Sequence, residues 1–218
     1  MLEVTLGRPG REFKTLLCLG AHCDDIEIGC GGTILRLIQE NPHLHIHWVV
    51  FSSDPQRSVE AHDSARAFLQ HAGGHDILIK EFRDSYFPAM ATEIKGCFEE
   101  LKTSIRPDVV LTHYRHDLHQ DHRMVSELTW NTFRNHLILE YEIPKYDGDL
   151  GAPNLFMPLS EDHWRRKIST LMECYPSQAN KHWFEPQTFA ALMRLRGIES
   201  NSPSGYAEAF YSRKIVLG

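Results

Sequence analysis

Short, continuously apolar segments alternate with segments of helical periodicity between residues 15 and 136, and this order restricts the possible folds strongly. Strands are expected at 15–20, 44–52, 76–79 and 108–113, and helices at 33–39, 55–72, 92–104 and 119–136. Strands that are joined through helices pair in parallel and are covered on both faces. The chain is therefore predicted to form an α/β fold, a Rossmann-like three-layer sandwich with a mostly parallel sheet flanked by helices, as one domain over residues 1–218.

The part of the chain after residue 136 has a less regular pattern. A further strand is expected at 137–143, helices at 161–174 and 186–195, and a strand at an edge of the sheet at 211–217. Ser160 is a suitable N-cap for the first of these helices. The segment 143–158 is rich in Pro, Gly and Asn and is expected to be a long loop. It either walls a substrate pocket or is a simple connection.

Composition argues against several classes of function. The net charge of −6 does not favour a nucleic-acid surface, and no apolar run approaches the roughly 20 residues of a membrane span. The five cysteines are odd in number and lack CxxC spacing, so we expect a reducing, cytoplasmic compartment. Residues 1–14 lack the apolar core of a signal peptide. Most of the 14 histidines, including His43, His45 and His47, are expected on solvated strand faces or in loops.

A histidine and two carboxylates follow the first predicted strand directly. His22, Asp24 and Asp25 stand just before the Gly-rich segment 29–32, which is expected to be a turn. In open α/β sheets, ligands bind beyond the carboxyl ends of the strands. An imidazole and a carboxylate three residues apart, His22 and Asp25, can share one cation. The side chain of Asp24 then points elsewhere and is free to act as a base.

A second polar cluster follows the predicted strand 108–113. Catalytic zinc takes three protein ligands and leaves one position open, so one histidine of this cluster would complete the set of His22 and Asp25. Another histidine would then handle protons or polarise a carbonyl. His113 ends the strand and could simply be packed. The remaining members of the cluster are His116, Asp117, His119, Asp121 and His122.

Some members of the second cluster have two open interpretations. Asp117 either orients a histidine or caps the helix that follows, and Asp121 either orients His119 or lies on a solvated face. Further along the chain, residues 175–184 mix polar groups with aromatic rings that either stack on a sugar or pack inside the protein.

The two clusters resemble those of the PIG-L/LmbE family of zinc-dependent N-deacetylases. The first family motif, Ala-His-Pro-Asp-Asp, stands here as residues 21–25, with Cys23 in place of proline. The second, His-x-Asp-His, stands as residues 119–122. The resemblance implies the following roles: metal ligands His22, Asp25 and His122; general base Asp24; acid or oxyanion stabiliser His119. Cys23 is interpreted as a structural residue.

A third feature of the same resemblance is an Arg-x-x-Glu after the second strand, which matches Arg57 and Glu60. It implies that Arg57 binds substrate. The alternative is a surface arginine paired with Glu60, which sits at helical spacing. The resemblance also implies Zn²⁺, with Fe²⁺ or another divalent metal as an alternative, an N-acetylated amino sugar or glycoconjugate as substrate, and a possible homo-oligomer.

Other functions fit the residues less well. A dinucleotide-binding module would need GxGxxG, which segment 29–32 does not supply, and the acidic pair would repel a pyrophosphate. A non-haem iron oxygenase also uses two histidines and one carboxylate, but it would be expected on a β-rich scaffold. Hydrolysis of another amide uses the same chemistry and stays open. A sugar-binding protein without activity would not need both Asp24 and His119.

Overall fold

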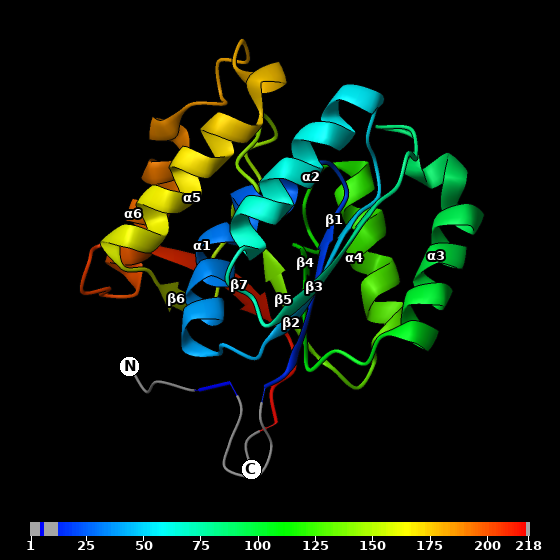
Figure 1. Cartoon of the computed structure of the whole chain (residues 1–218), viewed down its shortest axis with the longest axis horizontal. Helices are drawn as coiled ribbons and strands as arrows, with labels where there is room; N and C mark the ends of the chain where they lie inside the picture. Colours follow the sequence, from blue (N-terminus) through cyan, green and yellow to red (C-terminus); the bar gives the residue numbers. More distant parts are fainter. Residues whose placement is uncertain (1–4, 7–12, 217–218) are drawn as a thin grey trace.

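The computed structural model describes residues 5–6 and 13–216, in which seven strands form one sheet in the order β3-β2-β1-β4-β5-β7-β6 (Figure 1). The strands are β1 (Thr15–Gly20), β2 (His45–Val50), β3 (Gly74–Ile79), β4 (Val109–His113), β5 (Leu137–Tyr141), β6 (Leu155–Pro158) and β7 (Ala207–Ser212). The first five are parallel, and β7 pairs antiparallel with both β5 and β6.

Helices cover both faces of the sheet (Figure 1). They are α1 (Asp25–Glu40), α2 (Pro55–Leu69), α3 (Ala91–Ser104), α4 (Gln120–Thr132), α5 (Glu161–Cys174) and α6 (Pro186–Glu199), with 3₁₀ turns η1 (Phe87–Met90) and η2 (Pro176–Gln178). Alternate residues of β1 enter two cores: Leu16 packs on the side of α1, α2, α5 and α6, and Leu17 on the side of α3 and α4. This arrangement confirms the predicted three-layer α/β fold.

The Gly-rich segment expected to be a turn lies inside α1, so that prediction is wrong. A kink at Cys30 (φ −147°, ψ 15°) interrupts the helix. The glycines allow close packing instead: a Cβ on Gly29 would lie 2.1 Å from the Tyr141 ring, and one on Gly31 would lie 2.8 Å from the Phe68 ring. Helix α1 therefore sits directly on the sheet, with its first residue at the end of β1.

A buried ion pair satisfies the backbone groups that the kink leaves free. Glu208 of β7 accepts hydrogen bonds from the N–H groups of Gly32 (2.9 Å) and Thr33 (2.6 Å). Lys167 of α5 donates to the carbonyl of Ile28 (2.7 Å) and pairs with Glu208 at 2.6 Å. Both charged side chains are almost completely buried, so the pair is stabilising only because these bonds use their remaining polar atoms.

The C-terminal half differs most from the expectation. The expected loop 143–158 contains strand β6, which forms an edge of the sheet. The expected edge strand 211–217 is wrong in position, because β7 spans Ala207–Ser212 and lies between β5 and β6; Leu217 lies outside the described residues. Ser160 does cap α5, accepting from the N–H of His163 at 3.2 Å. Among the described helices, none is long and apolar enough to cross a membrane.

Candidate metal and active site

The candidate site lies beyond the carboxyl ends of β1 and β4, which are neighbours in the sheet. His22 follows β1, and Asp25 begins α1. His119 is the N-cap of α4, and His122 lies in the first turn of that helix. Parallel pairing of β1 with β4 therefore brings the two sequence motifs together at one edge of the sheet, where ligands of open α/β sheets bind.

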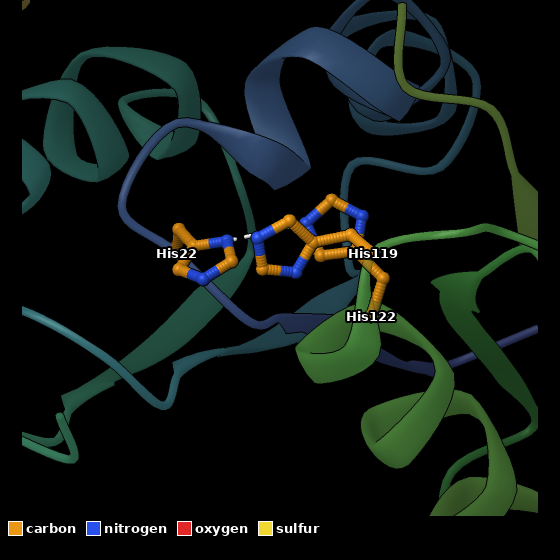
Figure 2. A group of neighbouring side chains, drawn as sticks. All are labelled: His22, His119 and His122. Carbon is orange, nitrogen blue, oxygen red and sulfur yellow. Dashed lines mark hydrogen bonds between the residues drawn. The ribbon is translucent and has the colours of Figure 1, made fainter. Parts of the chain in front are cut away.

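Donor atoms of three residues converge where the two motifs meet. Nδ1 of His22 lies 3.1 Å from Nε2 of His122. One oxygen of Asp25 is 3.4 Å from Nδ1 of His22, and the other is 3.4 Å from Nε2 of His122. Figure 2 shows these two rings facing each other, with His119 beside them. Tetrahedral zinc with bonds of about 2.0–2.1 Å places its ligand atoms about 3.3 Å apart. Each of these three distances lies near that value, with a different oxygen of Asp25 facing each histidine.

Two carboxylates contact Nε2 of His22, the ring nitrogen that does not face His122. Nε2 lies 3.1 Å from Asp84 and 3.2 Å from Asp121, which leaves Nδ1 directed at the cluster. Burial opposes a charge on this ring, but the carboxylates of Asp25, Asp121 and Asp84 outweigh it and raise the pKa of His22 well above its ordinary value. Asp84 is accordingly held ionised, because the hydrogen bond from His22 lowers its pKa. The surrounding carboxylates thus favour a positive charge at this point in the site, and a metal bound through Nδ1 would replace the proton there.

His122 is oriented in the same way from the other side. Its Nδ1 donates to Asp117 at 2.9 Å, so Nε2 is the free ring nitrogen. Burial and the neighbouring His113 lower the pKa of His122, which keeps it neutral as a ligand must be. Lys145, from the segment expected to be a loop, binds Asp117 at 2.8 Å. Asp117 thus orients a histidine. It also accepts from the N–H of His119 at 2.7 Å, but His119 is the N-cap of α4, so the interpretation of Asp117 as the cap is wrong.

His113 comes within reach of the same cluster, but the ring nitrogen that faces it, Nε2, is occupied. Donor atoms of Asp25, His113 and His122 all lie within 4.8 Å of one another. However, Nε2 of His113 accepts a hydrogen bond from the N–H of Ala21 at 2.9 Å, so its lone pair is used. The hydroxyl of Tyr141 contacts the same nitrogen at 3.2 Å. His113 is completely buried and acts as a packed support beneath Asp25, as the sequence suggested.

The two adjacent carboxylates point in different directions. Asp25 faces the histidines, and they lower its pKa against the opposing effect of burial. Asp24 instead forms an ion pair with Arg57, whose guanidinium lies 2.9 Å from Oδ1. The alternative partner of Arg57 is engaged elsewhere, because the carboxylate of Glu60 accepts from both the N–H and the hydroxyl of Ser177.

His119 is placed as a neutral hydrogen-bond donor. The N–H of Asp121 donates to Nδ1 of His119 at 3.2 Å, so in the neutral ring the proton is on Nε2. Burial, with His122 and His22 nearby, lowers the pKa of His119. The ring centroid lies 4.9 Å from that of His22 and 4.6 Å from that of His122.

Asp121 is completely buried, so the interpretation as a solvated residue is wrong. Its carboxylate accepts from the N–H groups of Ser85 (2.6 Å) and Phe87 (3.1 Å), besides contacting His22. It therefore fixes the segment that carries Asp84 over the site. Sequence reasoning missed Asp84, because a single acidic residue after a weak strand gives no recognisable signal.

Cys23 and two rings of the aromatic segment 175–184 are buried. The thiol of Cys23 is buried and contacts the carbonyl of Ser52 at 3.3 Å, which supports a packing role. In the aromatic segment 175–184, Tyr175 and Phe184 are buried, so these two rings pack inside the protein.

Comparison with known proteins identifies the family. The family model described as GlcNAc-PI de-N-acetylase, PIG-L, matches residues 17–133, which span both motifs. The chain belongs to the PIG-L family. An Escherichia coli (strain K12) protein named "Uncharacterized deacetylase YaiS" is 29% identical over 180 residues, covering 78% of this chain and 96% of that protein.

Solved structures share the fold at low identity. N,N'-diacetylchitobiose deacetylase from Pyrococcus horikoshii aligns with a TM-score of 0.68 at 19% identity, over 92% of this chain and 84% of that one. GalB, a 4-carboxy-2-hydroxymuconate hydratase from Pseudomonas putida KT2440, aligns with a TM-score of 0.72 at 15% identity, over 94% and 98%. A scaffold of this kind therefore also occurs in a hydratase, and the reaction must be argued from the residues of the site.

Proposed function

We propose that this PIG-L family protein is a metal-dependent hydrolase that removes the acetyl group from an N-acetylated amino sugar or glycoconjugate. Residues 1–218 are proposed to form one catalytic domain. The observation that carries the proposal is the converging donor set of His22, Asp25 and His122, whose nearest atoms are 3.1–3.4 Å apart. Two imidazoles and a carboxylate suit zinc, and they also suit Fe²⁺. When bound, the metal supplies positive charge that polarises an amide carbonyl and acidifies water.

Asp24 is the proposed general base. Its ion pair with Arg57 fixes the side chain away from Asp25. Asp24 accepts a proton from the attacking water and returns it to the nitrogen of the leaving amine, so the proton is conserved through the reaction.

His119 is the proposed stabiliser of the oxyanion. With Nδ1 accepting from the backbone, its Nε2–H is available to donate to the oxygen that becomes negative as water adds to the carbonyl. A neutral ring is sufficient for this role. Nε2 is also the atom that can carry a proton between groups of the site.

Arg57 is the proposed substrate-binding residue. Its side chain is 19% exposed at the site edge, and one guanidinium nitrogen is engaged with Asp24. A planar guanidinium has further N–H groups that can donate to sugar hydroxyls. The sugar as substrate is supported by the family membership and by the deacetylase names of its relatives. A cytoplasmic location is supported by five unpaired cysteines.

The nucleotide-binding alternative is disfavoured by the same geometry. The first turn of α1 carries Asp25 and Glu27, both buried, where a dinucleotide-binding fold would present backbone N–H groups to a phosphate. The ionised carboxylate of Asp25 at that position repels an anionic ligand.

Two pairs of variants test the assignment of roles. Asp24→Asn should retain metal and lose acetate release by about 10²–10⁴-fold, whereas Asp63→Asn, at an exposed aspartate of α2, should not change it. His122→Ala should lose metal, whereas His116→Ala, at an exposed histidine of the same cluster, should keep it. Normal turnover by Asp24→Asn would remove Asp24 from the role of base. Full metal content in His122→Ala would reassign the ligand.

A further inference from the structure

A second histidine cluster lies at the opposite end of the sheet. His45 and His47 occupy alternate positions at the start of β2, where every second side chain points to the same face, and His43 lies in the turn just before the strand. We expected these residues to be solvated. The side chain of His45 is 42% exposed, in line with that expectation, whereas that of His47 is only 17% exposed, and both contact Asp76 of β3.

The contacts place three ligand-type atoms around one point. Nε2 of His45 lies 2.8 Å from Oδ2 of Asp76, and Nδ1 of His47 lies 3.1 Å from the same oxygen. The two ring centroids are 4.7 Å apart. The three donor atoms all lie within 4.8 Å of one another. One carboxylate oxygen is therefore shared by two imidazole nitrogens.

The backbone holds this arrangement. β2 and β3 pair in parallel with His47 opposite Asp76 and His45 opposite Gly74. A Cβ on Gly74 would lie 2.6 Å from Nδ1 of His45, so the missing side chain leaves the space that the ring occupies. Ligands carried by two hydrogen-bonded strands lose little freedom when they bind an ion, which favours binding.

We propose that His45, His47 and Asp76 form a second metal site, which binds a divalent transition-metal ion such as Zn²⁺, Cu²⁺ or Ni²⁺. Imidazole nitrogen favours these ions over Mg²⁺ and Ca²⁺. Three protein ligands leave further positions open, and Asp76 is 66% exposed, so solvent reaches the ion.

This site is separate from the candidate active site. His45 pairs with Thr15, the first residue of β1, whereas His22 follows the last residue of that strand, Gly20. A strand of this length spans about 20 Å. The proposal does not depend on the proposed reaction, and it predicts that the protein binds two metal ions per chain when metal is in excess.

The test is a calorimetric titration of the chelator-treated full chain with Zn²⁺. The wild-type protein should show two binding events. His47→Gln and Asp76→Asn should each weaken one of them by more than about tenfold and should leave acetate release unchanged. His43→Gln, at an exposed histidine just before β2, is the matched control and should keep both events.

A second variant separates the two sites. His122→Ala should lose the other binding event and keep the one that depends on His47. Addition of Zn²⁺ to this variant should shift the NMR signals of the His45 and His47 rings. If His47→Gln and Asp76→Asn bind as much zinc as the wild type, or if the two ring signals do not move, the second site does not exist, whatever the outcome at His122.

Discussion

Replacing Glu27 by glutamine should make the protein less sensitive to alkaline pH. Glu27 is completely buried in α1, two residues after the candidate ligand Asp25. Its Oε1 accepts hydrogen bonds from Ser64 at 2.6 Å and from Tyr175 at 2.7 Å, and Oε2 has no hydrogen-bond partner among the described residues. Burial outweighs these bonds and raises the pKa of Glu27 from 4.5 to about 8.

The sign and size of the effect follow from proton binding. Between pH 4.5 and about 8 the folded protein keeps the proton on Glu27, while the unfolded chain has lost it. The unfolded state then binds fewer protons, so the free energy of unfolding falls as pH rises through this window. For these two pKa values the fall is about 3 kcal/mol between about pH 5.5 and about pH 8. Glutamine is neutral and similar in shape, so Glu27→Gln should lack this contribution.

Urea unfolding of the chelator-treated proteins at the two pH values measures the effect. The free energy of unfolding of Glu27→Gln, relative to wild type, should be about 3 kcal/mol more favourable at the higher pH than at the lower. Glu93→Gln, at an exposed position of α3, controls for the loss of one carboxyl group. The same difference between Glu27→Gln and wild type at both pH values would refute the reasoning, since it would mean that Glu27 is ionised in the folded protein.

Three further predictions concern packing and the metal. Gly29→Ala should lower the free energy of unfolding by about 1–3 kcal/mol, because the new Cβ meets the Tyr141 ring. Gly96→Ala on α3, where a Cβ meets no described atom within 4 Å, should raise it by about 0.4–1 kcal/mol. Chemical unfolding measures both. Asp117→Asn should weaken metal affinity by about 10–100-fold, because His122 loses its orienting carboxylate, and unchanged affinity in a competition with a chelator would exclude this role. Cys23→Ala should keep full metal content by elemental analysis, since the thiol faces Ser52; loss of metal would show that the sulfur contributes.

The central strand β1 could be predicted because it contains an unbroken apolar run. Leu16 and Leu17 are buried on opposite faces, so β1 shows no alternation and is recognised as a strand covered on both sides. Strand β6 could not be predicted. It is short, ends at Pro158, and is half-buried, so its existence depends on pairing with β7 rather than on its own residues.

The Gly-rich segment shows why a local signal misleads. Consecutive glycines usually predict a turn, but here Gly29 and Gly31 are required by aromatic rings from distant parts of the chain. The sequence alone does not reveal that Tyr141 and Phe68 press against this helix. Nor does it reveal that Lys167 and Glu208 satisfy the backbone at the kink.

For the candidate site too, the sequence predicted the candidate ligands but not the residues that orient them. The position of two motifs after two strands was sufficient to predict that His22 and Asp25 lie near a histidine of the second cluster, because parallel strands end at the same edge of the sheet. The choice of His122 rested on the family resemblance. The residues that orient them, Asp84 and Asp117, come from contacts between segments that are distant in sequence and leave no periodic signal.

The most direct test of the central claim is acetate release from a panel of N-acetylated amino sugars before and after removal of metal. Our account predicts that the purified protein releases acetate from at least one of them, loses this activity when a chelator removes its metal, and regains it with about one zinc or iron ion per chain at the His22 site. Acetate release that continues at full rate after elemental analysis shows the metal to be gone would contradict the account.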